Sequence, residues 1–151
     1  MDHSIKAGEL FLSGCNCAQA VAVAFTDITG MDTKTMAKLS APFGGGMGRM
    51  REVCGAVSGM LMVLGLLYGY DDTVEDDAQK REHYKAVQEL AGKFREECGS
   101  IICREILKNP PSDPNPTPRT AEFYAKRPCA RMVMTAARLL DEYIAEHPIE
   151  A

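Results

Sequence analysis

Six cysteines are the residues of this chain with the most distinctive chemistry. Cys54 opens a glycine-rich run, Cys54-Gly-Ala-Val-Ser-Gly59, and the others are Cys15, Cys17, Cys98, Cys103 and Cys129. A thiol can exchange with a disulfide, and a thiolate can ligate zinc or iron. Six cysteines in 151 residues are about 4%, which is too few for a disulfide scaffold and more than an ordinary core needs. The thiols are therefore the candidate functional residues.

The cysteine spacing excludes several known sites. No Cys-x-x-Cys pair is present, so the thioredoxin-like redox motif, the covalent haem motif and the local cluster run of bacterial ferredoxins are all missing. Gaps of 36, 48 and 25 residues separate Cys17, Cys54, Cys103 and Cys129, so these thiols can meet only after folding. Four that meet can ligate zinc or a [2Fe–2S] cluster, whereas two can cycle between dithiol and disulfide. The spacing leaves these open, together with inert packing as small apolar residues.

Four of the cysteines share a position that favours thiolate chemistry. Each lies in or near the first turn of an expected helix, where the partial positive charge of the helix N-terminus lowers a thiol pKa. A cysteine used only for packing has no reason to prefer a helix start. The four are Cys17 after Asn16, Cys54 after Val53, Cys103 after Ser100, and Cys129 after Pro128.

The elements that must position these thiols are helices. Apolar residues recur at helical spacing, and no long segment alternates at period two, so we predict one all-α domain over residues 1–151, a bundle of about five to seven helices. Asn16 and Asp32 are the expected N-caps of the second and third helices. Helices are expected over 5–12, 17–28, 33–40, 53–68, 75–97, 100–107 and 128–146, with an irregular proline-rich connection over 109–118.

Glycines are expected to shape the site. The four glycines at 44, 45, 46 and 48 predict a loop, and the amides of Gly44, Gly45 and Gly46 can form an anion-binding nest beside Cys54. The alternative is a tight turn where helices crowd. Gly55 and Gly59 are four residues apart, so they share a helix face and allow another backbone to approach closely.

Two arginines flank this loop. Arg49 and Arg51 can lower a thiol pKa or hold an acidic substrate, although such arginines are more often solvated surface residues.

Charge and hydropathy narrow the class of protein. The net charge of −4, without a basic stripe, argues against a nucleic-acid partner. The longest apolar segment, 53–68, is about 24 Å long as a helix, short of the roughly 30 Å core of a bilayer, and is expected to be a buried helix. The first six residues lack the apolar stretch of a signal peptide. We therefore expect a cytoplasmic protein with no membrane span, whose thiols begin reduced.

Taken together, five stretches resemble the redox-active proteins of the C_GCAxxG_C_C family over about Leu10 to Leu140. The resemblance maps the family's four cysteines onto Cys17, Cys54, Cys103 and Cys129. It implies a redox role, with a hint of cluster ligation from a related multihaem cytochrome, and it implies no substrate. Cys15 and Cys98 fall outside the pattern. The matching stretches are Asn16–Ala20, Phe43–Met47, Cys54–Gly59, Cys103–Glu105 and Cys129.

Two hypotheses follow. In the first, Cys17, Cys54, Cys103 and Cys129 converge beside Gly44–Gly46 as a redox site, through thiol–disulfide exchange or through a metal or [2Fe–2S] centre. In the second, the same thiols hold zinc or another metal in a non-catalytic helical binding module. The expected partner is a redox protein or a small molecule, and a homodimer is a candidate assembly. Metal analysis of anaerobically purified protein discriminates between the two hypotheses.

Overall fold

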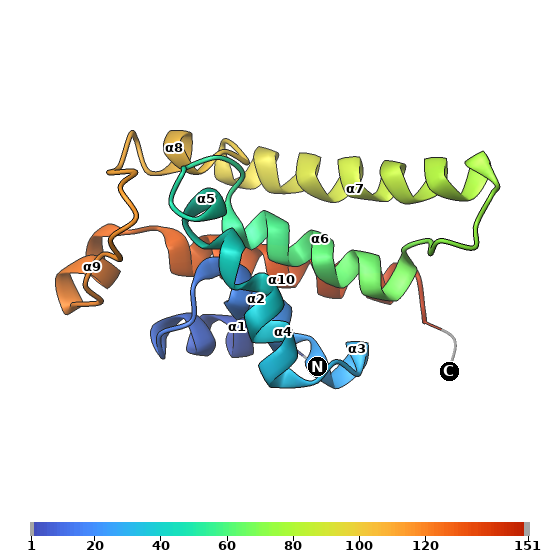
Figure 1. The fold of residues 1–151 in the computed structure, drawn as a ribbon, viewed down its shortest axis with the longest axis horizontal. Coiled ribbons are helices and arrows are strands. Elements are labelled where there is room, and N and C mark those ends of the chain that lie inside the picture. The colour runs from blue at the N-terminus through green and yellow to red at the C-terminus, as the bar shows by residue number, and fades with distance from the viewer. Residues whose placement is uncertain (1, 150–151) are drawn as a thin grey trace.

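The computed structural model describes residues 2–149, and this part of the chain is helical (Figure 1). Within it, the one pairing of extended backbone is an isolated antiparallel bridge between Val53 and Ile102. The predicted all-α class is confirmed. Six helices have eight or more residues, and shorter helical segments bring the number in the described residues above the predicted five to seven. The elements are α1 (His3–Leu12), α2 (Cys17–Ala24), α3 (Thr26–Thr29), α4 (Thr33–Ser40), the 3₁₀ turn η1 (Ala41–Phe43), α5 (Gly44–Met47), α6 (Gly55–Tyr68), α7 (Asp77–Cys98), α8 (Cys103–Ile106), α9 (Ala121–Lys126) and α10 (Cys129–Glu146).

Side-chain caps determine where the helices near the site begin. The Asn16 side chain accepts a hydrogen bond from the backbone amide of Gln19, and the Gln19 side chain accepts one from the backbone amide of Asn16. Together they form a reciprocal capping box at the start of α2. Asp32 caps α4 by accepting the amide of Thr35. Both predicted N-caps are confirmed. The helix expected over 17–28 is divided at Phe25 into α2 and α3, and α9 was not predicted.

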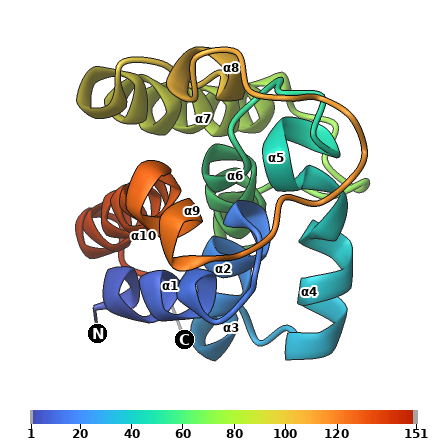
Figure 2. The same ribbon diagram turned by 90° about the vertical axis from the view of Figure 1, so that its left-hand side faces the viewer.

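The apolar helix α6 is central to the bundle. It lies between α7 on one side and α2 and α10 on the other, while α1 packs on α2 and α10 (Figures 1 and 2). Its side chains Met60, Val63 and Leu64 are fully buried, as expected of a core helix. None of the helices described here is long and apolar enough to cross a membrane.

Gly55 and Gly59 make the contact between α6 and α2 possible. A Cβ atom added at Gly59 would lie 2.6 Å from the carbonyl oxygen of Ala18, and one at Gly55 would lie 3.1 Å from the Cβ of Cys17. The distance at Gly59 is shorter than real Cβ contacts, and the distance at Gly55 is at their lower limit. At Gly59 the neighbouring atom belongs to the backbone, so it cannot rotate away. The predicted close approach is confirmed, and it brings the first turn of α2 against the first turn of α6.

The glycine-rich segment differs from the predicted loop. Residues 45–49 all have positive φ, and the carbonyls of Gly45 and Gly46 accept the amides of Arg51 and Glu52. The segment is therefore a compact left-handed turn with its own hydrogen bonds. Glycine adopts this conformation without steric cost, whereas Arg49 and Arg51, at φ of 68° and 63°, adopt it at a cost of about 1 kcal/mol or more each.

At the start of α1, the buried His3 joins this helix to two others, α3 and α10. His3 stacks on Phe25 with ring centroids 4.1 Å apart. Its Nδ1 lies 2.6 Å from Asp141 Oδ1 on α10, and its Nε2 lies 2.9 Å from Asp27 Oδ2 on α3. These contacts join the start of α1 to α3 and α10.

Candidate functional site

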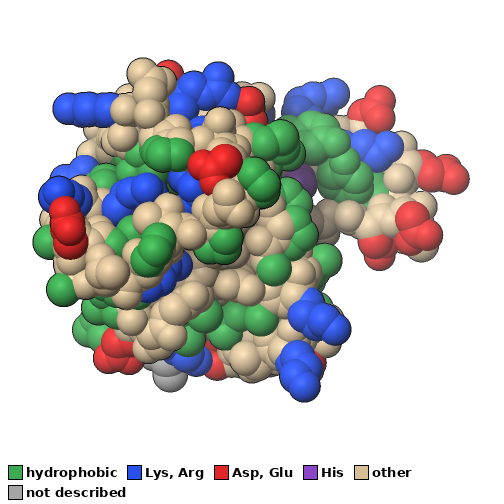
Figure 3. Space-filling model, turned by 60° about the vertical axis from the view of Figure 1, so that its left-hand side comes forward, with side chains coloured by type: hydrophobic (Ala, Val, Ile, Leu, Met, Phe, Trp, Pro, Cys, Tyr) green, Lys and Arg blue, Asp and Glu red, His purple; other side chains and the backbone are tan. Residues whose placement is uncertain are grey.

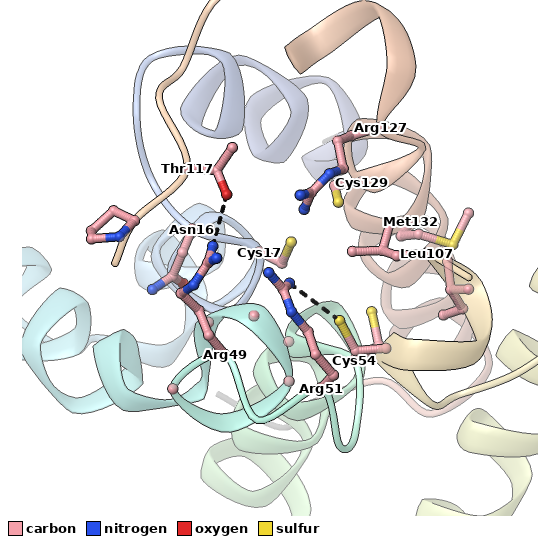
Figure 4. A pocket seen from close by; sticks show the side chains of 18 of the residues that line it. Asn16, Cys17, Arg49, Arg51, Cys54, Leu107, Thr117, Arg127, Cys129 and Met132 are labelled. Atoms are coloured by element: carbon pink, nitrogen blue, oxygen red, sulfur yellow. Dashed lines mark hydrogen bonds between the residues drawn. The ribbon is translucent and has the colours of Figure 1, made fainter. Parts of the chain in front are cut away.

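A cavity of about 340 Å³ lies at the end of the bundle where α2, α6, α8 and α10 begin. All four predicted cysteines, Cys17, Cys54, Cys103 and Cys129, contribute to its lining, as do Gly44, Gly45 and Gly46. Each cysteine is the first residue or the N-cap of its helix, so the predicted helix-start positions are confirmed. Four thiols that are far apart in the sequence thus line one space. Figure 4 shows three of them, Cys17, Cys54 and Cys129, around it.

Cys17 and Cys129 form a thiol pair across the junction of α2 and α10. The two thiols influence each other's acidity. The neighbouring Cys129 raises the pKa of Cys17 well above its ordinary value, and burial adds to this effect. The interaction with Cys17 lowers the pKa of Cys129 to about 7, helped by the charges of Arg127, Arg119 and Arg51 against the opposing effect of burial. A substantial fraction of Cys129 is therefore thiolate at neutral pH.

Cys54 and Cys103 are positioned by the short antiparallel bridge. The amide of Cys54 donates to the carbonyl of Ile101 over 2.7 Å, and the amide of Cys103 donates to the carbonyl of Glu52 over 2.6 Å. The two cysteines each follow one member of the Val53–Ile102 pair. They therefore lie on the same face of the bridge as diagonal neighbours, a relation that places Cα atoms about 7–8 Å apart.

Burial dominates the acidity of this second pair. It raises the pKa of Cys54 to about 12, although the amides of Ala56 and Val57 at the start of α6 oppose it. Burial likewise raises the pKa of Cys103, against the hydrogen bond and charge of Arg51. The expectation that a helix start lowers the pKa of all four thiols is therefore wrong for three of them. Desolvation outweighs the helix terminus at Cys54 and Cys103, and the neighbouring Cys129 has the largest effect at Cys17.

Arg51 is the residue whose placement departs most from expectation. It is only 4% exposed, and its Nη1 donates to the Sγ of Cys103 over 3.7 Å. The interpretation of Arg51 as a solvated surface residue is wrong, and its alternative role beside a thiol is the one observed. Backbone hydrogen bonds hold Arg51 in this position, because its amide donates to the Gly45 carbonyl of the turn and its own carbonyl accepts from the amide of Arg104 on α8.

The irregular segment 109–118 forms the outer wall of the cavity. The Nε of Arg49 donates to the Asp113 carbonyl over 2.7 Å, and its Nη1 donates to the Thr117 hydroxyl over 2.8 Å. The Nε of Arg51 donates to the Pro111 carbonyl over 2.9 Å. Figure 2 shows the segment between α8 and α9 passing outside α5 on its way to α9. The sequence predicted segment 109–118 only as an irregular connection and not as part of the site.

Two further arginines of the cavity were not predicted from the sequence. Arg119 and Arg127 line the cavity from either side of α9. Arg119 donates hydrogen bonds to the carbonyls of Phe11 and Cys15, and these bonds hold the end of α1 next to segment 109–118. Arg127 stands two residues before Cys129, and this proximity to a helix-start cysteine was the available signal.

Cys15 and Cys98 lie outside this group. Both are half-buried free thiols, and neither lines the cavity. Burial raises the pKa of each. Their exclusion from the predicted set of four agrees with this placement.

The glycines at the cavity act first through their small size. A Cβ atom added at Gly46 would lie 2.7 Å from the Cβ of Cys103, so any other residue there would displace the thiol. The amide of Gly44 donates to the carbonyl of Ala41 and is therefore occupied. An anion-binding role for the amides of Gly45 and Gly46 stays a prediction.

The donor set of the cavity is suitable for a metal, but its geometry is not. Four thiols are the ligands that zinc or a [2Fe–2S] cluster prefers. Over residues 2–149, however, no three His, Cys, Asp or Glu side chains are grouped so that they can hold one metal ion. The four thiols are instead arranged as the Cys17–Cys129 pair and a second, diagonal pair.

Comparison with known proteins relates this arrangement to a family. No curated protein and no solved structure matches the chain. One family model matches residues 15–143, from before Cys17 to beyond Cys129, and its description is "putative redox-active protein (C_GCAxxG_C_C)". Because the match covers most of the sequence and includes all four cavity cysteines, the chain belongs to the C_GCAxxG_C_C family.

Proposed function

We propose that this protein is a thiol–disulfide redox protein in which Cys129 attacks and Cys17 resolves. The observation that carries the proposal is that Cys17 and Cys129 line the same cavity, with the pKa of Cys129 lowered to about 7 mainly by its interaction with Cys17. A thiol with a pKa near the ambient pH is the most effective attacking group, because it is largely ionised and still strongly nucleophilic.

The reaction follows from this pair. The Cys129 thiolate attacks one sulfur of a substrate disulfide; a bond forms between Cys129 and that sulfur, and the other half leaves as a thiolate. Cys17 then loses its proton to the departing thiolate and attacks the Sγ of Cys129, which releases the second half of the substrate. The protein pair is oxidised to a disulfide by two electrons. The substrate disulfide is reduced to one thiol, which carries the proton from Cys17, and one thiolate, which takes a proton from water according to its own pKa.

The other two cysteines differ from Cys129 in ionisation. Cys54 and Cys103 have raised pKa values, so they remain protonated at neutral pH and are poor nucleophiles. We therefore assign the initial attack to Cys129 and not to the glycine-flanked Cys54. Cys54 and Cys103 are the candidate second dithiol, which can receive oxidation from the first pair by exchange.

A metal or [2Fe–2S] centre, in an electron-transfer protein or in a non-catalytic zinc module, is the second candidate. It is favoured by the presence of four cysteine side chains at one cavity. Anaerobically purified protein would then contain zinc, or iron with acid-labile sulfide, in stoichiometric amount, and replacing any of the four cysteines by serine would remove it. Replacing Cys15 or Cys98 would not.

Trapping the mixed disulfide tests the first candidate. Reduced, metal-free protein is treated with a small disulfide, and the modified cysteines are located by mass spectrometry. The wild type should form a Cys17–Cys129 disulfide, Cys17→Ser should accumulate a mixed disulfide on Cys129, and Cys129→Ser should accumulate none at either position. Cys15→Ser and Cys98→Ser serve as controls that keep the wild-type pattern. Preferential modification of Cys54 or Cys103 would overturn the assignment of roles.

A further inference from the structure

The charge around the thiol cavity is opposite in sign to that of the whole chain. The sequence has a net charge of −4, yet the cavity lining contains four arginines and no aspartate or glutamate. The four are Arg49, Arg51, Arg119 and Arg127. On the face that carries the site, Figure 3 shows basic side chains in and around a hollow, next to hydrophobic ones. A concave surface with one sign of charge concentrates ligands of the opposite sign.

Arg51 is buried with part of its charge unsatisfied. Its Nε donates to Pro111 and its Nη1 donates to Cys103, but its Nη2 is fully buried and has no hydrogen-bond partner among the described residues. A buried guanidinium nitrogen without an acceptor is costly, because a charged group loses its water without compensation. This nitrogen is therefore a donor that an anionic ligand in the cavity would satisfy.

Arg127 supplies a second charge that lacks an anionic partner. It forms no ion pair with any carboxylate in residues 2–149, and its guanidinium lies over the ring of Phe123 at 5.1 Å. In Figure 4 the guanidinium groups of Arg51 and Arg127 point into the space beside Cys17 and Cys129. The other two arginines are engaged in holding the wall and the end of α1.

We propose that the cavity binds an oxyanion group between Arg51 and Arg127, and that this group is the carboxylate of a small disulfide substrate. The inference deepens the proposed function by naming the class of substrate, and it rests on that function for the reacting disulfide. Arginine suits this role because its planar donors match a carboxylate or another oxyanion with two parallel hydrogen bonds. The carboxylate would hold the substrate with a sulfur within reach of Cys129.

The size of the site agrees with a small substrate. A cavity of about 340 Å³ is at the lower end of the range typical of small-molecule sites, roughly 300–1,000 Å³. Its wall, 109–118, is tied down by Arg49 and Arg51. A folded protein substrate would need this wall to move, whereas a small carboxylated disulfide would not.

Binding is tested first, separately from reactivity. The Cys17→Ser, Cys129→Ser double variant is used, so that no exchange occurs, and its thermal unfolding is followed with added propionate or inorganic sulfate. Both anions should raise the unfolding temperature, and Arg127→Gln should remove most of the effect. Arg81→Gln removes the same charge from an exposed site on α7 and is the matched control. Stabilisation by sulfate alone would identify an inorganic oxyanion site and overturn the carboxylate assignment, and equal stabilisation of all variants would overturn the subsite altogether.

Substrate preference is tested next with three disulfides of different charge. Dithiodipropionate is anionic, hydroxyethyl disulfide is neutral and cystamine is cationic. The wild type should react with the anionic compound about tenfold faster than with the neutral one, and slowest with the cationic one. Arg127→Gln should reduce this preference about tenfold, Arg51→Gln should act in the same direction, and Arg81→Gln should leave it unchanged. Arg127→Gln keeps the test valid if Arg51→Gln fails to fold, because Arg127 is only half-buried.

The two proposals fail in different ways. Equal rates with all three disulfides would overturn the anion subsite while leaving the thiol pair in place. No reaction with any disulfide, combined with propionate binding that depends on Arg127, would overturn the thiol–disulfide function and retain the subsite.

Discussion

The guanidinium of Arg51 donates to the Sγ of Cys103 over 3.7 Å, between residues that are 52 positions apart in the sequence. The contact links Arg51, which follows the left-handed turn and also has a positive φ, to the first residue of α8. It also places a positive charge beside a buried thiol, so that the pKa of Cys103 is raised less than burial alone would raise it. One arginine thus supports the cavity wall, a thiol and the proposed ligand.

Removing this charge should make Cys103 less reactive. In Arg51→Met the burial of Cys103 persists while the opposing hydrogen bond is lost, so the thiol should ionise at higher pH. Alkylation of Cys103 by iodoacetamide at pH 8 should slow about tenfold, because a hydrogen bond to a charged group contributes on the order of 1.5–3 kcal/mol. Mass spectrometry of the Cys103 peptide gives the rate, with Arg81→Met as control. An unchanged rate would show that the contact does not influence this thiol.

The alkylation of Cys129 should depend on pH with a midpoint near 7, because Cys17 and the nearby arginines lower its pKa to about that value against the opposing effect of burial. Below this pH Cys129 is protonated and reacts slowly, and above it the rate reaches a plateau. Cys17→Ala removes the interaction that lowers this pKa most, so the midpoint should move upward. Cys15→Ala, next to the site but outside the cavity, should keep the wild-type profile. A midpoint that stays near 7 in Cys17→Ala would contradict the role of the pair.

The close packing of α2 on α6 can be tested at Gly59. A methyl group there would lie 2.6 Å from the carbonyl oxygen of Ala18, so Gly59→Ala should separate the two helices and destabilise the fold by about 1–3 kcal/mol. Gly65→Ala is the matched control on the same helix, where an added Cβ meets nothing within 4 Å. It should stabilise by roughly 0.5–1 kcal/mol through helix propensity. Urea denaturation measures both, and similar effects of the two substitutions would refute the close approach.

The anchoring of the cavity wall can be tested at Arg49. Arg49→Ala removes the hydrogen bonds to Asp113 and Thr117, so the amides of segment 109–118 should exchange with solvent faster. We expect at least a fivefold increase, since each lost hydrogen bond is worth about 1 kcal/mol. Hydrogen exchange with mass spectrometry reports this, and peptides from α7 provide the internal reference. Unchanged exchange in 109–118 would mean that the wall is held by other contacts.

Local signals in the sequence predicted what depends on local structure. Asn16 with Gln19 predicts the start of α2, and the i, i+4 spacing of Gly55 and Gly59 predicts a contact face on α6, because capping and helix periodicity involve neighbouring residues. The helix-start positions of Cys17 and Cys129 follow from the same reasoning. Their presence at one cavity is now observed, and their redox role stays a prediction.

Features that depend on distant contacts could not be predicted in this way. The burial of Arg51 depends on a left-handed turn and on Pro111, 60 residues away. The pKa of Cys54 depends on how much of the bundle covers it, so its position at a helix start indicated the wrong direction. The wall role of 109–118 depends on Arg49 reaching across to it.

The composition of that wall has an entropic consequence. Five of the ten residues in 109–118 are proline, so the backbone of this segment samples few conformations even in the unfolded chain. Ordering it on folding therefore costs less than ordering an average segment of equal length. Two arginine side chains are enough to hold a wall without regular secondary structure, because much of its rigidity is already present in the covalent rings.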